Sequence, residues 1–221
     1  MQSYRYVLCT LIGFNLLGCA HAPPANNATQ VSVDGRRIIY NGALDPQANA
    51  QVASLLQQHP DIDTLVITSR GGEIGLGIGL GQLVFDHGLN VDIPDYCFSS
   101  CANYVFPAGK IKYLHRHATL GWHGGAMQEI QPETPEMARL YQAYIGPIRA
   151  KEKAFFQHIQ VQPSMLTDGQ KPAYAAFEHC IGWSYSREKM ESYGIRNIQY
   201  RDGAWQPHSS FEGKCIFKIE D

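Results

Sequence analysis

Short runs of strand character alternate with segments of helical periodicity along the first half of the chain, and this alternation limits the possible folds strongly. The segments expected to be strands are 37–40, 64–68, 91–93, 112–114 and 118–122. The segments expected to be helices are 47–58, 74–84 and 99–106. Parallel strands need such a helical crossover between them, because the chain must return to the same edge of the sheet. The sequence therefore predicts a layered α/β domain with a largely parallel sheet.

A longer helical arm is expected over about residues 134–160. Thr134, Pro135 and Glu136 form a favourable helix start, with a capping hydroxyl, a proline at the first helical position and an acidic first turn. Gly146-Pro147 should kink or split the arm. Its apolar stripe predicts core or interface packing; the residues are Met137, Leu140, Tyr141, Tyr144 and Ile148. After the arm, strand signals return from Trp183, with a helix expected over 187–193.

The first 18 residues have the organisation of an export signal. Arg5 precedes an apolar run from Val7 to Leu17, which is too short to span a bilayer as a helix. The segment Leu16-Leu17-Gly18-Cys19 resembles the bacterial lipobox. That resemblance implies cleavage before Cys19 and lipidation of this residue, with a diacylglycerol and a palmitate. The alternative is an ordinary secretory signal cut near Ala20 or Ala22.

The lipobox resemblance also implies a location and a domain organisation. Residue 20 is alanine and not the aspartate that resembles an inner-membrane retention signal, so we expect an outer-membrane lipoprotein facing the periplasm. Residues 1–18 are the signal peptide, 19–30 a lipidated tether and 31–221 a single α/β domain. The chain has 18 basic and 20 acidic residues, and its basic residues form no run. Nucleic acid is therefore not an expected partner.

Four cysteines remain after Cys9 is removed with the signal and Cys19 is lipidated. An even number in an oxidising compartment predicts two disulfides. Cys97 and Cys101 are four residues apart, so on one helical turn their Cα atoms lie about 6 Å apart, within bonding range. The preferred pairs are Cys97 with Cys101 and Cys180 with Cys215. A zinc site is the alternative, but no CxxC or His-x3-His spacing supports it, so no metal is expected.

Three turns carry residue types that serve in acyl transfer, and each follows an expected strand. Ser69-Arg70-Gly71-Gly72 opens a helix, so its glycine amides can face outward as hydrogen-bond donors. Cys97-Phe98-Ser99-Ser100-Cys101 places two serines where another strand passes into a helix, a position that exposes a hydroxyl beside the next amide. Gly121-Trp122-His123-Gly124-Gly125 ends a strand on a histidine with room to reach a serine.

Taken together, these turns resemble the proteolytic subunit of the Clp protease and its relatives in the ClpP/crotonase superfamily, as an exported lipoprotein form. The resemblance covers residues 37–125 well and 183–195 loosely. It implies a ClpP/crotonase-like fold of repeated strand-turn-helix units and an envelope-located serine peptidase. Expected partners are a peptide or unfolded protein substrate and the membrane, through the lipid on Cys19. The helical arm is compatible with a homo-oligomer, and no cofactor is expected.

The same resemblance assigns roles to individual residues. Counting nine residues back from the Ala108-Gly109 pair, as the family spacing implies, places the nucleophile at Ser100. The amides of Gly72 and Cys101 would form the oxyanion hole, and His123 would be the general base. Ser99 is expected to cap the helix.

The third member of a catalytic triad has no match at the expected position. The family's aspartate falls at Ile181. The nearest upstream carboxylates are Glu178 and Asp168, and either could orient His123 as the catalytic acid. Arg70 also replaces the usual proline. A non-catalytic binding or scaffold lipoprotein that has lost its acid is therefore the alternative function.

Three further hypotheses concern other residues. Alternate glycines over 75–81 suggest a phosphate loop, but close helix packing accounts for them better. His115, His117 and His123 could hold a metal ion if the strands brought them together. A Ser-Lys dyad would require one of the lysines near the serine turn or on the arm; these are Lys110, Lys112, Lys151 and Lys153.

Overall fold

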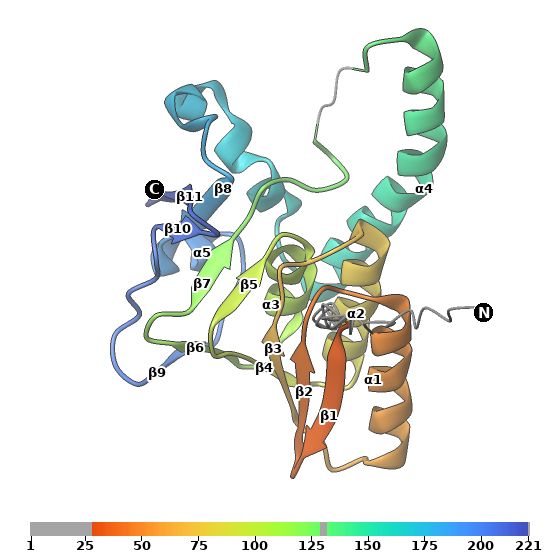
Figure 1. The fold of residues 1–221 in the computed structure, drawn as a ribbon, viewed down its shortest axis with the longest axis vertical. Helices are drawn as coiled ribbons and strands as arrows, with labels where there is room; N and C mark the ends of the chain where they lie inside the picture. Colours follow the sequence, from red (N-terminus) through yellow and green to blue (C-terminus); the bar gives the residue numbers. More distant parts are fainter. Residues whose placement is uncertain (1–27, 129–131, 221) are drawn as a thin grey trace, which may run out of the picture.

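A six-stranded sheet with the strand order β1-β2-β3-β4-β6-β9 lies at the centre of the computed structural model, which describes residues 28–128 and 132–220 (Figure 1). Its strands are β1 (Gln30–Asp34), β2 (Arg37–Asn41), β3 (Thr64–Thr68), β4 (Asn90–Ile93), β6 (Lys112–His115) and β9 (Ile198–Arg201). β1 pairs with β2 in the antiparallel sense, and the other neighbouring pairs are parallel. The prediction of an α/β domain with a largely parallel sheet is confirmed. The signal segment, Cys19 and most of the tether lie outside the described residues.

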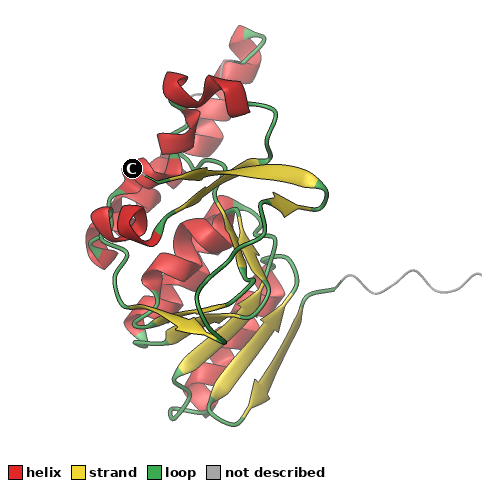
Figure 2. Cartoon of the chain, turned by 90° about the vertical axis from the view of Figure 1, so that its left-hand side faces the viewer, coloured by secondary structure: helices red, strands yellow, loops and turns green. Residues whose placement is uncertain are grey.

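Two helices form the crossovers between the first parallel strands. Helix α1 (Pro46–Gln58) connects β2 to β3, and α2 (Ile74–Asp86) connects β3 to β4. The Asp45 carboxylate caps α1 by accepting hydrogen bonds from two amides of its first turn. The buried side chains of α1 recur every four residues, so one face of the helix packs on the core; they are Ala48, Val52 and Leu56. Figure 2 shows the strands of the large sheet in front of the helices that cover it.

Helix α2 packs unusually closely on the next helical segment, the π-helix η1 (Cys101–Val105). A Cβ atom at Gly77 would lie 2.6 Å from Tyr104 Cδ2, and one at Gly81 would lie 2.5 Å from the Tyr104 carbonyl oxygen. Only glycine permits this approach. At Gly79, by contrast, an added Cβ atom would have no described neighbour within 4 Å. The glycines thus lie in a helix and not in a phosphate loop, and two of them serve close packing.

The predicted arm is helix α4 (Pro135–Ile159), which extends away from the sheet (Figure 1). The Thr134 hydroxyl caps it by accepting a hydrogen bond from the Met137 amide. Pro147 lies inside the helix, which continues past it, so the arm is not split as the sequence allowed. Phe155 and Phe156, near its end, are buried in the core. None of the helices within 28–128 and 132–220 is both long and apolar enough to cross a membrane.

Two smaller sheets stand beside the carboxyl ends of the large one. β5 (Tyr96–Phe98) is parallel to β7 (Thr119–Gly121), and β8 (Gly182–Tyr185) is parallel to β11 (Lys214–Ile219), which also pairs with β10 (Ser210–Phe211). The remaining helical segments are α3 (Phe106–Ala108), η2 (Pro163–Leu166), η3 (Asp168–Gln170), η4 (Pro172–Phe177) and α5 (Arg187–Ser192). Both expected disulfides, Cys97–Cys101 and Cys180–Cys215, are present.

Candidate active site

The three turns singled out in the sequence meet at the carboxyl ends of neighbouring strands. Phe98 pairs with Gly121 at the end of the parallel β5–β7 ladder, and the Ser99 amide donates a 2.8 Å hydrogen bond to the Gly121 carbonyl. Ser69, at the end of β3, accepts a 2.9 Å hydrogen bond on its carbonyl from the Phe98 amide. The backbone therefore brings the glycine turn, the serine turn and the segment before His123 side by side.

A cavity of about 530 Å³ lies where these turns meet. Its walls include Gly71, Gly72, Phe98, Ser99, His123 and Ile181. This cavity holds both a hydroxyl and an imidazole, and it opens beside the glycine turn. Parallel α/β sheets commonly bind ligands outside the carboxyl ends of their strands, and the cavity has this position.

Ser99, and not Ser100, lines this cavity. Ser99 is half-buried and has a φ of +58°, a left-handed conformation that is strained for a residue with a side chain. A strained turn between a strand and a helix is the geometry that exposes a nucleophilic serine in other hydrolases. Ser100 is only 2 % exposed, and its hydroxyl donates a 2.7 Å hydrogen bond to the Gly72 carbonyl. Of the two serines, Ser99 therefore lines the cavity, whereas Ser100 is the nucleophile expected from the sequence.

The π-helix η1 follows the two serines and changes their spacing from the Ala108-Gly109 pair. The Phe106 amide bonds to the Cys101 carbonyl five residues back, so this turn contains one residue more than an α-helical turn. If the family spacing assumes a regular helix here, the position counted back from Ala108-Gly109 moves by one residue, from Ser100 to Ser99. The sequence does contain a signal for the irregular turn, because in an α-helix the ring of Pro107 would clash with the carbonyl four residues before it.

The glycine turn provides space in front of backbone amides. Gly71 has a φ of +88°, and a Cβ atom there would lie 2.8 Å from both the Ser100 nitrogen and the Ser99 Cβ. Neither the Gly72 amide nor the Ser100 amide donates a hydrogen bond to a residue of the described chain. Both amides are therefore without an acceptor within the described chain, Gly72 in the cavity wall and Ser100 directly after Ser99. Cys101, the donor expected from the sequence, is buried inside η1 and does not line the cavity.

His123 is exposed and lies between two cavities. Its ring is 5.5 Å from the Phe98 ring, centroid to centroid. Neither ring nitrogen makes a hydrogen bond within the described residues, to Ser99 or to a carboxylate. His123 also lines a second cavity, of about 410 Å³. The imidazole is thus available for proton transfer but is not oriented by an acid.

The two carboxylates proposed to orient His123 have other surroundings. Asp168 is buried, forms an ion pair with Lys171 and accepts a hydrogen bond from the Tyr193 hydroxyl. Burial raises the pKa of Asp168, but the hydrogen bonds from Lys171 and Tyr193 outweigh it and hold that pKa below its usual value. Asp168 is therefore a structural residue. Glu178 is exposed and shares the second cavity with His123, without a hydrogen bond to it.

Arg70, which stands where the resemblance gives a proline, has a partner on a distant hairpin. Arg70 forms an ion pair with Glu212, and both side chains line the cavity with Ser99. Next to Glu212, the Phe211 ring stacks on the Phe98 ring at 5.0 Å. The β10–β11 hairpin therefore forms one wall of the site. The sequence does not predict this wall, because no local pattern connects Glu212 with Arg70, 142 residues earlier.

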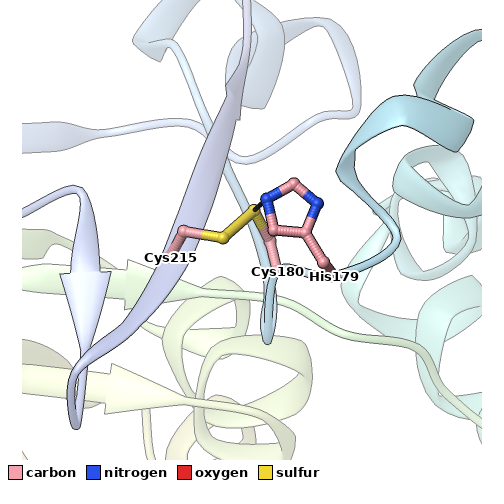
Figure 3. Close-up of side chains that lie close together, drawn as sticks. All are labelled: His179, Cys180 and Cys215. Atoms are coloured by element: carbon pink, nitrogen blue, oxygen red, sulfur yellow. Dashed lines mark hydrogen bonds between the residues drawn. A yellow bond between two sulfur atoms is a disulfide. The ribbon is translucent and has the colours of Figure 1, made fainter.

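The three histidines proposed as metal ligands lie apart. His115 contacts the carboxylates of Asp92 and Asp202 at 3.2 and 2.8 Å, whereas the His117 ring stacks on His208. The one group with three ligand-type side chains in close contact among the described residues consists of His179, Cys180 and Cys215 (Figure 3). Its cysteines form a disulfide and so offer no thiolate to a metal ion.

None of the four lysines proposed for a Ser-Lys dyad, Lys110, Lys112, Lys151 and Lys153, lines the cavity that contains Ser99. Lys110 and Lys112 line a cavity of about 480 Å³ that contains no serine, and Lys151 lines another. Lys112 is 5 % exposed, and its ammonium group donates to the carbonyl oxygens of Gly109 and Arg196 at 2.6 and 3.0 Å. Burial lowers the pKa of Lys112 from 10.5 to about 8. Lys112 thus links three backbone segments.

This lowered pKa predicts a pH-dependent stability. Between pH 8 and 10.5 the unfolded chain keeps a proton on Lys112 that the folded chain releases, so stability rises with pH across this window. Relative to Lys112→Met, the wild type should gain about 2 kcal/mol of unfolding free energy from pH 8 to pH 10. Urea unfolding of both proteins at several pH values measures this difference. If the unfolding free energies of the two proteins change in parallel with pH, the pKa of Lys112 in the folded state is not lowered.

The chain matches no known family model, and no curated protein is detectably similar to it in sequence. Its function must therefore be inferred from the site itself. The site combines Ser99, His123 and Gly72 around one cavity, and the Ser100 amide follows directly after Ser99 in the chain. These are the groups that acyl transfer through a serine requires: a nucleophile, a base and donors for an oxyanion.

Proposed function

We propose that the protein is a serine hydrolase of the cell envelope, a peptidase that uses Ser99 as its nucleophile and His123 as its general base. The observation that carries this proposal is the left-handed Ser99 at a strand-to-helix turn, in the same cavity as His123. The amides of Gly72 and Ser100 are the proposed oxyanion donors. Relative to the expectation from the sequence, the nucleophile moves from Ser100 to Ser99, and the second oxyanion donor moves from Cys101 to Ser100.

In this mechanism the His123 imidazole accepts the proton of the Ser99 hydroxyl while the oxygen attacks the substrate carbonyl. The two amides stabilise the negative charge that develops on the carbonyl oxygen. His123 then protonates the leaving amine, which gives an acyl group on Ser99. A water molecule, activated by the same imidazole, releases the acyl group and restores the hydroxyl.

The ClpP/crotonase-type fold is part of the proposal. It is supported by the order of the units along the chain: β3 leads to the glycine turn and α2, β5 leads to the serine turn and η1, and β7 leads to His123. The envelope location and the lipid on Cys19 are supported by the export signal. The two disulfides are consistent with an oxidising compartment.

A non-catalytic binding lipoprotein is the second candidate, and one observation favours it. His123 has no carboxylate partner within the described residues, so its tautomer and orientation are not fixed by the group that fixes them in a triad. A Ser-His dyad can still act, at a lower rate. Labelling by an active-site reagent distinguishes the two candidates, because it requires an activated serine.

The experiment is labelling of the purified mature protein with a fluorophosphonate probe, under non-reducing conditions. We expect the wild type and Ser100→Ala to react, and Ser99→Ala to remain unlabelled, because the buried Ser100 hydroxyl does not face the cavity. Heat-denatured wild type gives the background. Equal labelling of Ser99→Ala and wild type would reject Ser99, and a folded but unreactive wild type would favour the binding protein.

A further inference from the structure

We propose that the cavity at the amino ends of β6 and β9 binds a phosphate monoester, with the phosphate group on Lys110, Lys112 and Arg196 and the organic part on an apolar wall. This cavity, of about 480 Å³, lies apart from the candidate active site. Among the described residues, none lines both this cavity and one of the two cavities that contain His123. The inference therefore goes beyond the proposed function and does not depend on it.

The parallel order of the large sheet separates this cavity from the Ser99 turn. Strands β3, β4, β6 and β9 run in the same direction, and the glycine turn follows the carboxyl end of β3. In the wall of the cavity, Gly88, Lys110 and Asn197 lie within two residues before the starts of β4, β6 and β9. The cavity is therefore at the amino ends of the strands, opposite the end that carries the candidate active site.

The charged residues in the wall of this cavity are all basic. Three of its twelve lining residues are lysine or arginine and none is acidic, although the whole chain has 18 basic and 20 acidic residues. Lys110 and Arg196 are exposed, and neither forms an ion pair within residues 28–128 and 132–220. The acid nearest to the wall along the chain, Asp86, is paired with His158. The three positive charges are therefore not neutralised by the protein, and together they favour an anion.

Lys112 contributes a buried cation that has one donor left for a ligand. Its ammonium group donates to the carbonyl oxygens of Gly109 and Arg196, and both of these residues line the cavity. An ammonium group has three donors, and the third has no acceptor among the described residues. Burial lowers the pKa of Lys112 because it disfavours the charged form. An anion beside the ammonium group would offset part of that cost.

Hydrogen bonds hold the segments that carry the three cations together before a ligand binds. The Asn197 side-chain amide donates a 3.1 Å hydrogen bond to the Lys110 carbonyl, and the Lys112 backbone amide donates one of 3.0 Å to the Asn197 carbonyl. Asn197 has a φ of +59°, a left-handed conformation that asparagine adopts more readily than most residues. The segments before β6 and β9 are thus fixed against each other, which lowers the entropy lost on binding.

A phosphate monoester matches this cavity better than a carboxylate does. A phosphate group carries a charge of about −1.5 to −2 at pH 7 and three acceptor oxygens, so each of three cations can contact one oxygen. A carboxylate offers a single charge and two oxygens. Phe85, Pro107 and Ile159 add an apolar wall, and Phe85 is 37 % exposed. An organic group attached to the phosphate would cover this wall and gain from its burial.

The test is isothermal titration calorimetry of the mature protein with inorganic phosphate and with phenyl phosphate. We expect both to bind one to one, and phenyl phosphate to bind about tenfold more tightly, because its ring covers the apolar wall. Replacing Lys110 and Arg196 together with glutamine should weaken both affinities about tenfold. Replacing Arg139 and Lys153 with glutamine is the matched control, because these exposed basic residues lie outside the cavity. Phe85→Ala should weaken the binding of phenyl phosphate only.

The outcomes decide both the site and the class of ligand. If the wild type binds neither compound, or if the two double variants bind equally well, the cavity is not a phosphate site. Equal affinities of the wild type for inorganic phosphate and phenyl phosphate would overturn the monoester, since the apolar wall would then contribute nothing. These titrations require no activity at Ser99, so they stand or fall independently of the proposed function.

Discussion

His123→Ala is expected to lower kcat/KM for a peptide ester cleaved at Ser99 by about 10² to 10⁴-fold, the usual contribution of a general base. Without the imidazole, no group in the cavity is free to accept the serine proton, because the nearby Glu212 is already paired with Arg70. The fold should be unaffected, since the His123 side chain is exposed. Steady-state ester hydrolysis, with circular dichroism as a check on folding, measures the effect.

Glu178→Gln provides the comparison for this experiment. It removes the one carboxylate that shares the second cavity with His123, and it should change kcat/KM for an apolar ester less than threefold, because no hydrogen bond joins the two side chains. A loss as large as that of His123→Ala would instead identify Glu178 as the third member of a triad. Full activity of His123→Ala would reject the imidazole as the base.

The second large effect concerns stability. Replacing Cys180 and Cys215 together with serine is expected to lower the free energy of unfolding by about 4 kcal/mol, because this disulfide closes a loop of 35 residues. The corresponding double substitution of Cys97 and Cys101 opens a separation of only four residues and should cost about 2 kcal/mol. Urea unfolding without reductant measures both losses.

The two double variants also differ in their expected effect on the site. Cys97 and Cys101 flank the Ser99 turn, so their loss should reduce fluorophosphonate labelling more than the loss of the longer disulfide does. The opposite order of stability losses would mean that chain entropy does not determine what these disulfides contribute.

The sequence predicts the sheet and the turns because both depend on local patterns. Alternating strand and helix signals are sufficient for the parallel order of β2, β3, β4 and β6. The glycine, serine and histidine turns each follow a strand, and parallel strands bring their carboxyl ends together. Both disulfides follow from an even count and one short spacing. These features need no information about distant contacts.

The features that the sequence did not predict depend on contacts between distant segments. The β10–β11 hairpin places Phe211 and Glu212 at the site through pairing that leaves no periodic pattern in the chain. The structural role of Asp168 depends partly on Tyr193, 25 residues later, although the Lys171 spacing of three residues could have suggested a local ion pair. Residues of η4, β8 and β11 line the second cavity beside His123, and no sequence motif connects these three elements.

The π-helix has a consequence for how this site can change during evolution. A chain shortened by one residue within Cys101–Val105 could close an ordinary α-helical turn, which would bring Ser100 to the position that Ser99 now holds. Under the proposed function, the second serine would then supply the hydroxyl at this position after such a deletion. A chain with a single serine would lose its hydroxyl there.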